Sequence, residues 1–150
     1  MSANALTIGG ADVSAFTGIN GGTADEMGLK LSQVNFALAM FADSATPSNR
    51  WTALKATAGA VEIVGVADVE ISAKTVSVEI NLANKAGVVV DFAKENLLVS
   101  DVLFNIDGKN GEILRASGDL AVNVAEFFSV NGRFAFEKSS EKLTLDDGKT

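Results

Sequence analysis

The 150-residue chain contains no cysteine, no histidine and no tyrosine, and each absence removes a class of chemistry. Without cysteine the chain can form neither disulfides nor thiolate metal sites. Without histidine it has no imidazole to act as a general base or to ligate zinc, iron or copper. Tyrosine is favoured on recognition surfaces, so its absence argues against a surface built for recognition. We therefore expect a protein that is not an enzyme and that carries no cofactor, with calcium considered separately below.

The chain also has few basic residues and no long apolar run. Nineteen acidic residues against twelve basic ones give a net charge of −7, which disfavours nucleic acid and anionic membrane surfaces as partners. Hydrophobic residues make up 47%, yet no uninterrupted run approaches the roughly 20 residues of a membrane helix. The first residues lack the basic and apolar regions of a secretory signal, so an exported parent protein would carry its signal elsewhere. The length fits a single domain, residues 1–150.

The apolar residues that are present follow a period of two, which is typical of strands with one buried face. The clearest runs are Val34, Phe36, Leu38 and Met40, then Val76, Val78 and Ile80, then Leu120, Val122 and Val124. No sustained spacing of three and four residues indicates an amphipathic helix. The pattern predicts an all-β fold of repetitive short strands.

The chain also repeats itself in order, since residues 28–81 are loosely echoed by residues 96–138. A first block, 28–38, matches 96–106, and a second, which starts with Leu54-Lys55-Ala56-Thr57, matches one that starts with Leu114-Arg115-Ala116-Ser117. Self-similarity in fixed order indicates a repeat architecture, here two sub-repeats within one domain.

The two ends suggest a longer period. Leu6-Thr7-Ile8 near the start resembles Leu143-Thr144-Leu145 near the end. One interpretation is that the chain is a unit of a larger array, and the other is that both segments are ordinary terminal turns.

Two architectures fit short strands with tight corners. In a β-solenoid the corners need only small residues, whereas in an antiparallel sandwich or meander each corner is a hairpin that favours Asn-Gly or Asp-Gly. Asn131-Gly132 suits a hairpin, but the corresponding Ala73-Lys74 does not. This comparison favours a β-solenoid-like fold with an internal two-fold repeat, and leaves the antiparallel sandwich or meander as the alternative.

Trp51 is the sole tryptophan, and it follows an exposed loop, residues 43–50, that holds the only proline. With Asn49 and Arg50 it forms a candidate ligand site, in which the indole would stack on a carbohydrate ring. The alternative is that Trp51 is part of the core, as buried tryptophans usually are.

The segment 107–112 offers oxygen ligands and glycines, as calcium loops do. Asp107, Asn110 and Glu112 are therefore candidate calcium ligands, although Lys109 stands where the EF-hand spacing needs an oxygen. A solvated Asp-Gly turn is the other interpretation. A second candidate, Asp146-Asp147-Gly148, would need a neighbouring module to complete the site.

Three blocks of the sequence, 51–56, 114–118 and 127–138, resemble the tandem β-repeats of very large secreted bacterial surface proteins, adhesins among them. The resemblance implies a structural extender or scaffold module at the cell surface or outside the cell. Its partners would be adjacent repeat modules or other copies of itself, in arrays or filaments. A carbohydrate- or surface-polymer-binding module is the alternative, followed by an enzyme that acts on a polysaccharide.

Overall fold

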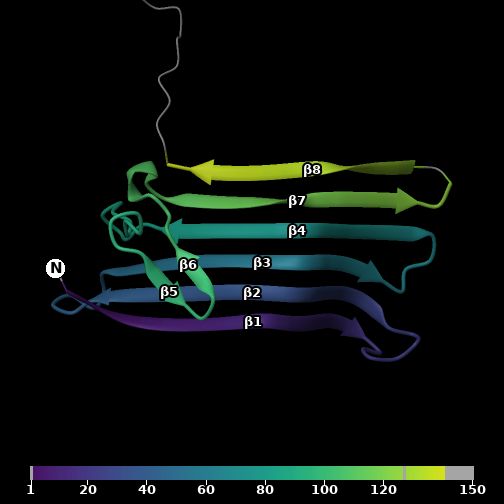
Figure 1. The fold of residues 1–150 in the computed structure, drawn as a ribbon, viewed down its shortest axis with the longest axis horizontal. Helices are drawn as coiled ribbons and strands as arrows, with labels where there is room; N and C mark the ends of the chain where they lie inside the picture. The colour runs from purple at the N-terminus through teal and green to yellow at the C-terminus, as the bar shows by residue number, and fades with distance from the viewer. Residues whose placement is uncertain (1, 127, 141–150) are drawn as a thin grey trace, which may run out of the picture.

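The computed structural model describes residues 2–126 and 128–140 and is dominated by one antiparallel sheet (Figure 1). Strands account for 67% of the described residues, which contain no α-helix. The sheet is a meander in the order β1-β2-β3-β4-β7-β8. Its strands are β1 (Ala3–Ile19), β2 (Met27–Asp43), β3 (Arg50–Val64), β4 (Val69–Leu82), β7 (Ile113–Val124) and β8 (Phe128–Ser139). The all-β prediction is therefore confirmed.

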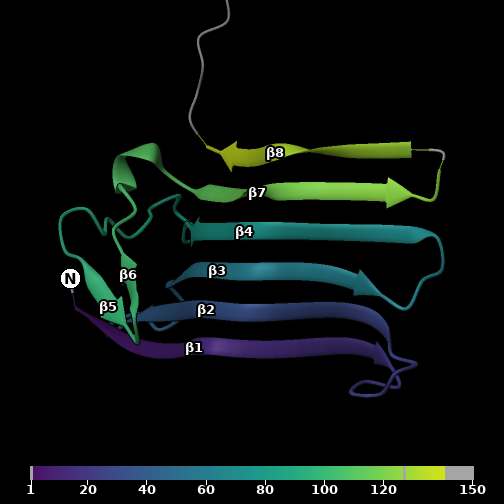
Figure 2. The ribbon, with the colours of Figure 1, turned by 45° about the vertical axis from the view of Figure 1, so that its right-hand side comes forward.

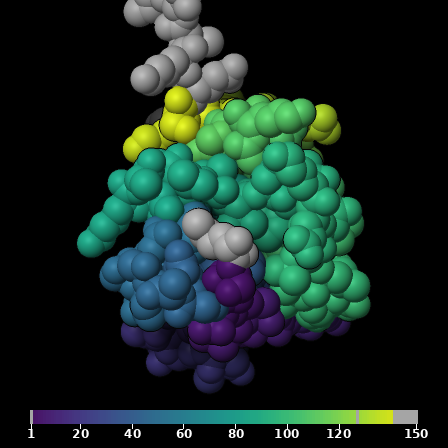
Figure 3. Space-filling model, turned by 90° about the vertical axis from the view of Figure 1, so that its left-hand side faces the viewer, coloured from purple at the N-terminus to yellow at the C-terminus, as the bar shows by residue number. Residues whose placement is uncertain are grey.

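The chain leaves the sheet once, between β4 and β7. This excursion, residues 83–112, contains the hairpin of β5 (Leu97–Val99) and β6 (Val102–Phe104), and then a short 3-10 helix, η1 (Gly108–Asn110). The hairpin lies over one face of the sheet at the end where β4 stops and β7 starts (Figures 1 and 2). Seen from that end, residues of the excursion form one side of the molecule (Figure 3). The rest of that face, and the whole opposite face, have no second layer from the described residues.

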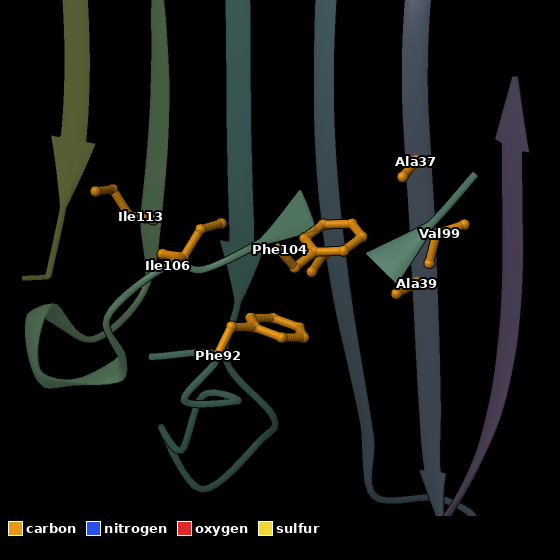
Figure 4. Close-up of a cluster of buried hydrophobic side chains, with 8 residues drawn as sticks. Ala37, Ala39, Phe92, Val99, Phe104, Ile106 and Ile113 are labelled. Atoms are coloured by element: carbon orange, nitrogen blue, oxygen red, sulfur yellow. The ribbon is translucent and has the colours of Figure 1, made fainter. Parts of the chain in front are cut away.

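The buried core lies between this excursion and the sheet (Figure 4). The rings of Phe92 and Phe104 stack with their centroids 5.1 Å apart. The sheet meets them with small side chains, Ala37, Ala39 and Ala53, which are buried to 1% exposure or less. Small residues are needed there because larger side chains would hold the hairpin away from the strands.

The strands are much longer than the sequence pattern predicts, at 12 to 17 residues in the main sheet. Two predicted corners are wrong: Ala73-Lys74 lies inside β4 and Asn131-Gly132 lies inside β8. The β3–β4 connection instead runs through Gly65, whose φ of 79° is left-handed. Thr75, beside the first predicted corner, explains that error. Its left-handed φ of 53° interrupts the alternation of side chains without ending the strand.

The described strands pair antiparallel and close no solenoid, so the meander that stood as the alternative fits the chain. The two halves of the second repeat block occupy corresponding places in two hairpins. Lys55 pairs with Glu79 across β3 and β4, and Arg115 pairs with Glu137 across β7 and β8. The halves of the first block do not correspond, because 28–38 belongs to β2 whereas 96–106 spans the β5–β6 hairpin.

Candidate functional site

One face of the main sheet is apolar over almost its whole extent, and we call it the apolar face. Residues directly opposite each other in antiparallel strands point to the same side, so the register identifies its rows. One row runs Ile8, Leu38, Leu54, Ile80, Leu114, and the next runs Gly10, Phe36, Ala56, Val78, Ala116, Phe136. Towards the other end of the strands follow Leu31, Val61, Ala73, Leu120 and then Leu29, Ile63, Ile71, Val122, Val130.

Left-handed residues in the middle of the strands keep both ends of the sheet apolar on this one face. Along β2 the apolar positions change from odd to even numbers at Gln33 (φ 54°), and along β4 they do so at Thr75 (φ 53°). β1, which runs antiparallel to β2, changes from even to odd beside Asp12 (φ 52°). A hollow of about 410 Å³ is lined by residues from both sides of these phase changes, by Val76 and Phe136 on one side and by Leu120 on the other. The two ends of the sheet therefore share one face.

The apolar face is uncovered by any described residue outside its own strands. Phe134 and Phe136 on the edge strand β8 are 49% and 58% exposed, and Leu6 on the opposite edge is 56% exposed. The inner strands carry half-buried Val and Leu side chains that are shielded only by their neighbours in the sheet. Monomeric soluble proteins rarely expose contiguous apolar surfaces of this extent, which makes the apolar face the candidate interaction surface.

The opposite, polar face carries the charges of the inner strands. Glu79 accepts from Arg115 (2.8 Å) and lies 3.4 Å from Lys55, and Arg115 also bonds Glu137 (3.0 Å). Charges thus alternate in sign along one row across four strands. Partial exposure limits the contribution of each pair to about 1 kcal/mol or less.

Lys55 also fixes the β5–β6 hairpin to the sheet. Its ammonium donates to the carbonyl oxygen of Leu103 (3.1 Å) and to Oδ1 of Asn105 (3.0 Å). Beside these contacts an open hollow of about 460 Å³ lies between the hairpin and the sheet, and Asn35 and Asp101 also line it. The ammonium of Lys55 in this hollow is already hydrogen-bonded to Leu103 and Asn105.

Trp51 lies in the core rather than on a binding surface. The residue is 6% exposed, and its Nε1 donates to the carbonyl oxygen of Val88 at 2.9 Å. Asn49 accepts from Asn84 Nδ2 (2.7 Å), and Arg50 donates from Nε to the carbonyl oxygen of Pro47 (3.0 Å). The three predicted ligand residues thus make local contacts, and the indole has no open face for a sugar.

The predicted calcium ligands are engaged in backbone hydrogen bonds. Asp107 caps η1 by accepting from the Lys109 N–H (2.9 Å), and Glu112 accepts from the Ala83 N–H (2.9 Å). Asn110 is exposed within η1. No cluster of three or more metal-binding His, Cys, Asp or Glu side chains occurs among residues 2–126 and 128–140. The second candidate, Asp146-Asp147-Gly148, lies outside the described residues, as does the segment Leu143-Thr144-Leu145.

The carboxylates with shifted pKa values lie at turns and not in a cleft. A hydrogen bond from the Gly108 N–H lowers the pKa of Asp91, and one from the Ala45 N–H lowers that of Asp43. The pKa of Glu26 is lowered chiefly by the Gly22 N–H and then by Lys30. Each shift reflects a carboxylate that stabilises a loop, since hydrogen bonds from backbone N–H groups favour the charged form.

Comparison with protein-family models, with curated proteins and with solved structures finds no match to this chain. No described helix is long and apolar enough to span a membrane. The candidate functional site therefore rests on the geometry of the sheet.

The apolar face is also the feature that reasoning from the sequence missed. Its signal was in the sequence as period-two runs whose phase changes by one residue at Gln33 and Thr75. The phase change beside Thr75 was interpreted as a corner at Ala73-Lys74, which divided β4 into two short strands. Read as left-handed residues within continuous strands, the two phase changes would have predicted one apolar face.

Proposed function

We propose that the chain is a non-catalytic structural module whose sheet forms one layer of a larger β-structure. The observation that carries this proposal is the uncovered apolar face. The excursion covers only one end of the polar face, so the whole apolar face is available for another layer. Stable domains pair such layers around a core. The polar face, with its row of alternating charges, would then be the outer, hydrated surface of the assembly.

The module would belong to an extended extracellular array, as the resemblance to bacterial surface repeats implies. Two similar hairpins, β3–β4 and β7–β8, support a repetitive origin. The absence of cysteine is compatible with a secreted bacterial protein whose core does without disulfides. The outer strands β1 and β8 each have one unpaired edge within the described sheet, where an adjacent module could add a strand.

A pair of substitutions on neighbouring residues of β4 tests the proposal. Val78 lies on the apolar face in register with Ala56 and Ala116, whereas Ser77 lies on the polar face in register with Thr57. Val78→Lys places a charge in the proposed contact surface, and Ser77→Lys adds the same charge to the outer surface. Analytical ultracentrifugation should show that wild type and Ser77→Lys sediment faster than a 15.5 kDa monomer, while Val78→Lys sediments as one.

Binding of an apolar fluorescent dye provides the second readout. The dye should bind Ser77→Lys and wild type strongly only at low protein concentration, where the apolar face is free. A chain that remains at 15.5 kDa at every concentration and binds no dye would contradict the proposal. Equal effects of the two substitutions on sedimentation would contradict it as well.

A further inference from the structure

We infer that the apolar face is covered by the same face of a second copy of this chain, so that two sheets form a two-layer homodimer. This inference rests on the proposed function and names the partner. It draws on the area of the face, the placement of charge and the side of the sheet on which the excursion lies.

The area of the face exceeds what a stable dimer needs. Strands of 12 to 17 residues are about 40–56 Å long at ~3.3 Å per residue, and six strands at ~4.8 Å spacing make a sheet ~29 Å wide. Even with the shortest strands, each face offers a footprint of about 1,100 Å². Two such faces in contact would remove about 2,200 Å² from water, against the ~1,600 Å² of a standard stable interface.

The distribution of charge favours an identical partner. Only two charged residues are in register with the apolar rows of the described strands: Arg50 at the start of β3, and Lys138 on the edge strand β8 beside Leu114. The central rows offer no charge for an oppositely charged partner to match. A surface that is apolar throughout complements itself, which is the requirement of a two-fold interface. The net charge of −7 then resides mainly on outer faces and loops, where it keeps the dimer soluble.

Nothing described obstructs the approach of a second sheet. The β5–β6 hairpin is bonded through Lys55 to the polar face, and its core contacts use Ala37, Ala39 and Ala53 on that same side. On the apolar side, the small Ala56 and Ala116 lie beside Val78 near the centre, between Phe36 and Phe136 in the same row. Two such surfaces can approach to the ~10 Å at which stacked sheets interdigitate, with strands crossing at about 30°.

The lack of cysteine allows a clean test by single-cysteine labelling of the full chain. Ala116 and Ser117 are neighbours on β7 and are both half-buried, but Ala116 lies on the apolar face and Ser117 on the polar face. Ala116→Cys and Ser117→Cys change the side-chain volume little and should preserve the fold. Each variant is alkylated with iodoacetamide over a range of protein concentrations, and its mass is followed by ultracentrifugation.

The homodimer requires a mass of twice 15.5 kDa and protection of Ala116→Cys alone. At total concentrations about 100-fold above the dimer dissociation constant, its alkylation should slow about 15-fold relative to dilute protein, because only the monomer reacts. Ser117→Cys should react at one rate throughout. The apparent midpoint of thermal unfolding should rise with protein concentration in the unlabelled chain.

Other results identify which claim fails. Larger particles in which both cysteines stay reactive would indicate pairing through the edges of β1 and β8, which overturns the homodimer and leaves a structural module. A monomer whose Ala116→Cys is protected only by phosphatidylcholine vesicles would overturn it in favour of a lipid surface. A monomer whose Ala116→Cys is protected without any addition would show that the chain covers its own face, and would overturn the proposed function too.

Discussion

Phe104 provides the sharpest test of how the β5–β6 excursion is held, because it is fully buried between the hairpin and the sheet. Phe104→Ala removes a ring that stacks on Phe92 at 5.1 Å and covers the alanines of β2 and β3. Truncation of a buried phenylalanine costs about 3–5 kcal/mol. A hairpin with strands of three residues has little stability of its own, so the loss should fall on the excursion and not on the six-stranded sheet.

Native-state hydrogen exchange separates these two regions. A local loss of 3–5 kcal/mol corresponds to a fall in amide protection of about 10² to several times 10³, at a factor of ten per ~1.4 kcal/mol. We expect this fall in residues 83–112, up to full loss of their protection, while the central strands β2, β3 and β4 keep most of theirs. The matched control is Leu103→Ala in the same strand, where the side chain is 42% exposed and the expected change is about 1 kcal/mol or less.

The result that would refute this reasoning is a uniform loss of protection across both regions. It would mean that the excursion and the sheet unfold as one unit, and that the core at one end supports the stability of the whole sheet. Equal effects of Phe104→Ala and Leu103→Ala would likewise show that the burial of Phe104 does not hold the hairpin.

Two further predictions concern backbone strain and acid stability. Thr75→Gly should raise the free energy of unfolding by about 0.5–1 kcal/mol, because a left-handed residue other than glycine costs about 1–2 kcal/mol and glycine loses part of that gain as entropy. The matched change Thr57→Gly, in an extended part of β3, should lower the free energy of unfolding by about 1 kcal/mol in denaturant unfolding. A loss of stability in Thr75→Gly would contradict the strain argument. Asp91→Asn should be less stable than wild type at neutral pH and should converge with it in acid: the Gly108 N–H lowers the pKa of Asp91, so its contribution is present above the ordinary pKa of an aspartate and is lost as the pH falls through the lowered value. Thermal unfolding from pH 7 to pH 2 measures this difference, and a gap that widens in acid would contradict the assignment.

The strands could be predicted because apolar and polar residues alternate in the sequence almost everywhere that side chains alternate between the two faces of the sheet. Val34, Phe36, Leu38 and Met40 lie on one face of β2, as their spacing indicates. The strand lengths could not be predicted, because threonine and glutamine do not favour the left-handed conformation that Thr75 and Gln33 adopt within continuous strands. Non-glycine residues adopt this conformation where neighbouring strands hold them, which is information from tertiary structure. The same limit applies to Asn131-Gly132, whose turn preference is overridden by pairing with β7.

The candidate site shows a different limit. Trp51 is the sole tryptophan and therefore the natural candidate to stack on a ligand. Its Nε1 instead donates to the carbonyl of Val88, 37 residues later. Val88 lies in the excursion, whose position the sequence pattern does not predict. Asp107 and Glu112 look like cation ligands in composition, but they are used by the N–H groups of Lys109 and Ala83. A local pattern identifies which oxygens are available, and the tertiary fold decides which donors reach them first.

The size of the buried core connects fold and function in this chain. The largest fully buried side chains among the described residues are Phe92, Phe104, Ile113 and Asn81, and all of them belong to the excursion or to the end of the sheet beneath it. The longer part of every strand thus has only its neighbours in the sheet to stabilise it. Hydrophobic burial is the main favourable term in folding, so adding a second layer to the apolar face should stabilise the sheet itself. If the apolar face pairs as proposed, folding and assembly would be coupled, because the contact with the partner would also supply the core that the isolated sheet lacks.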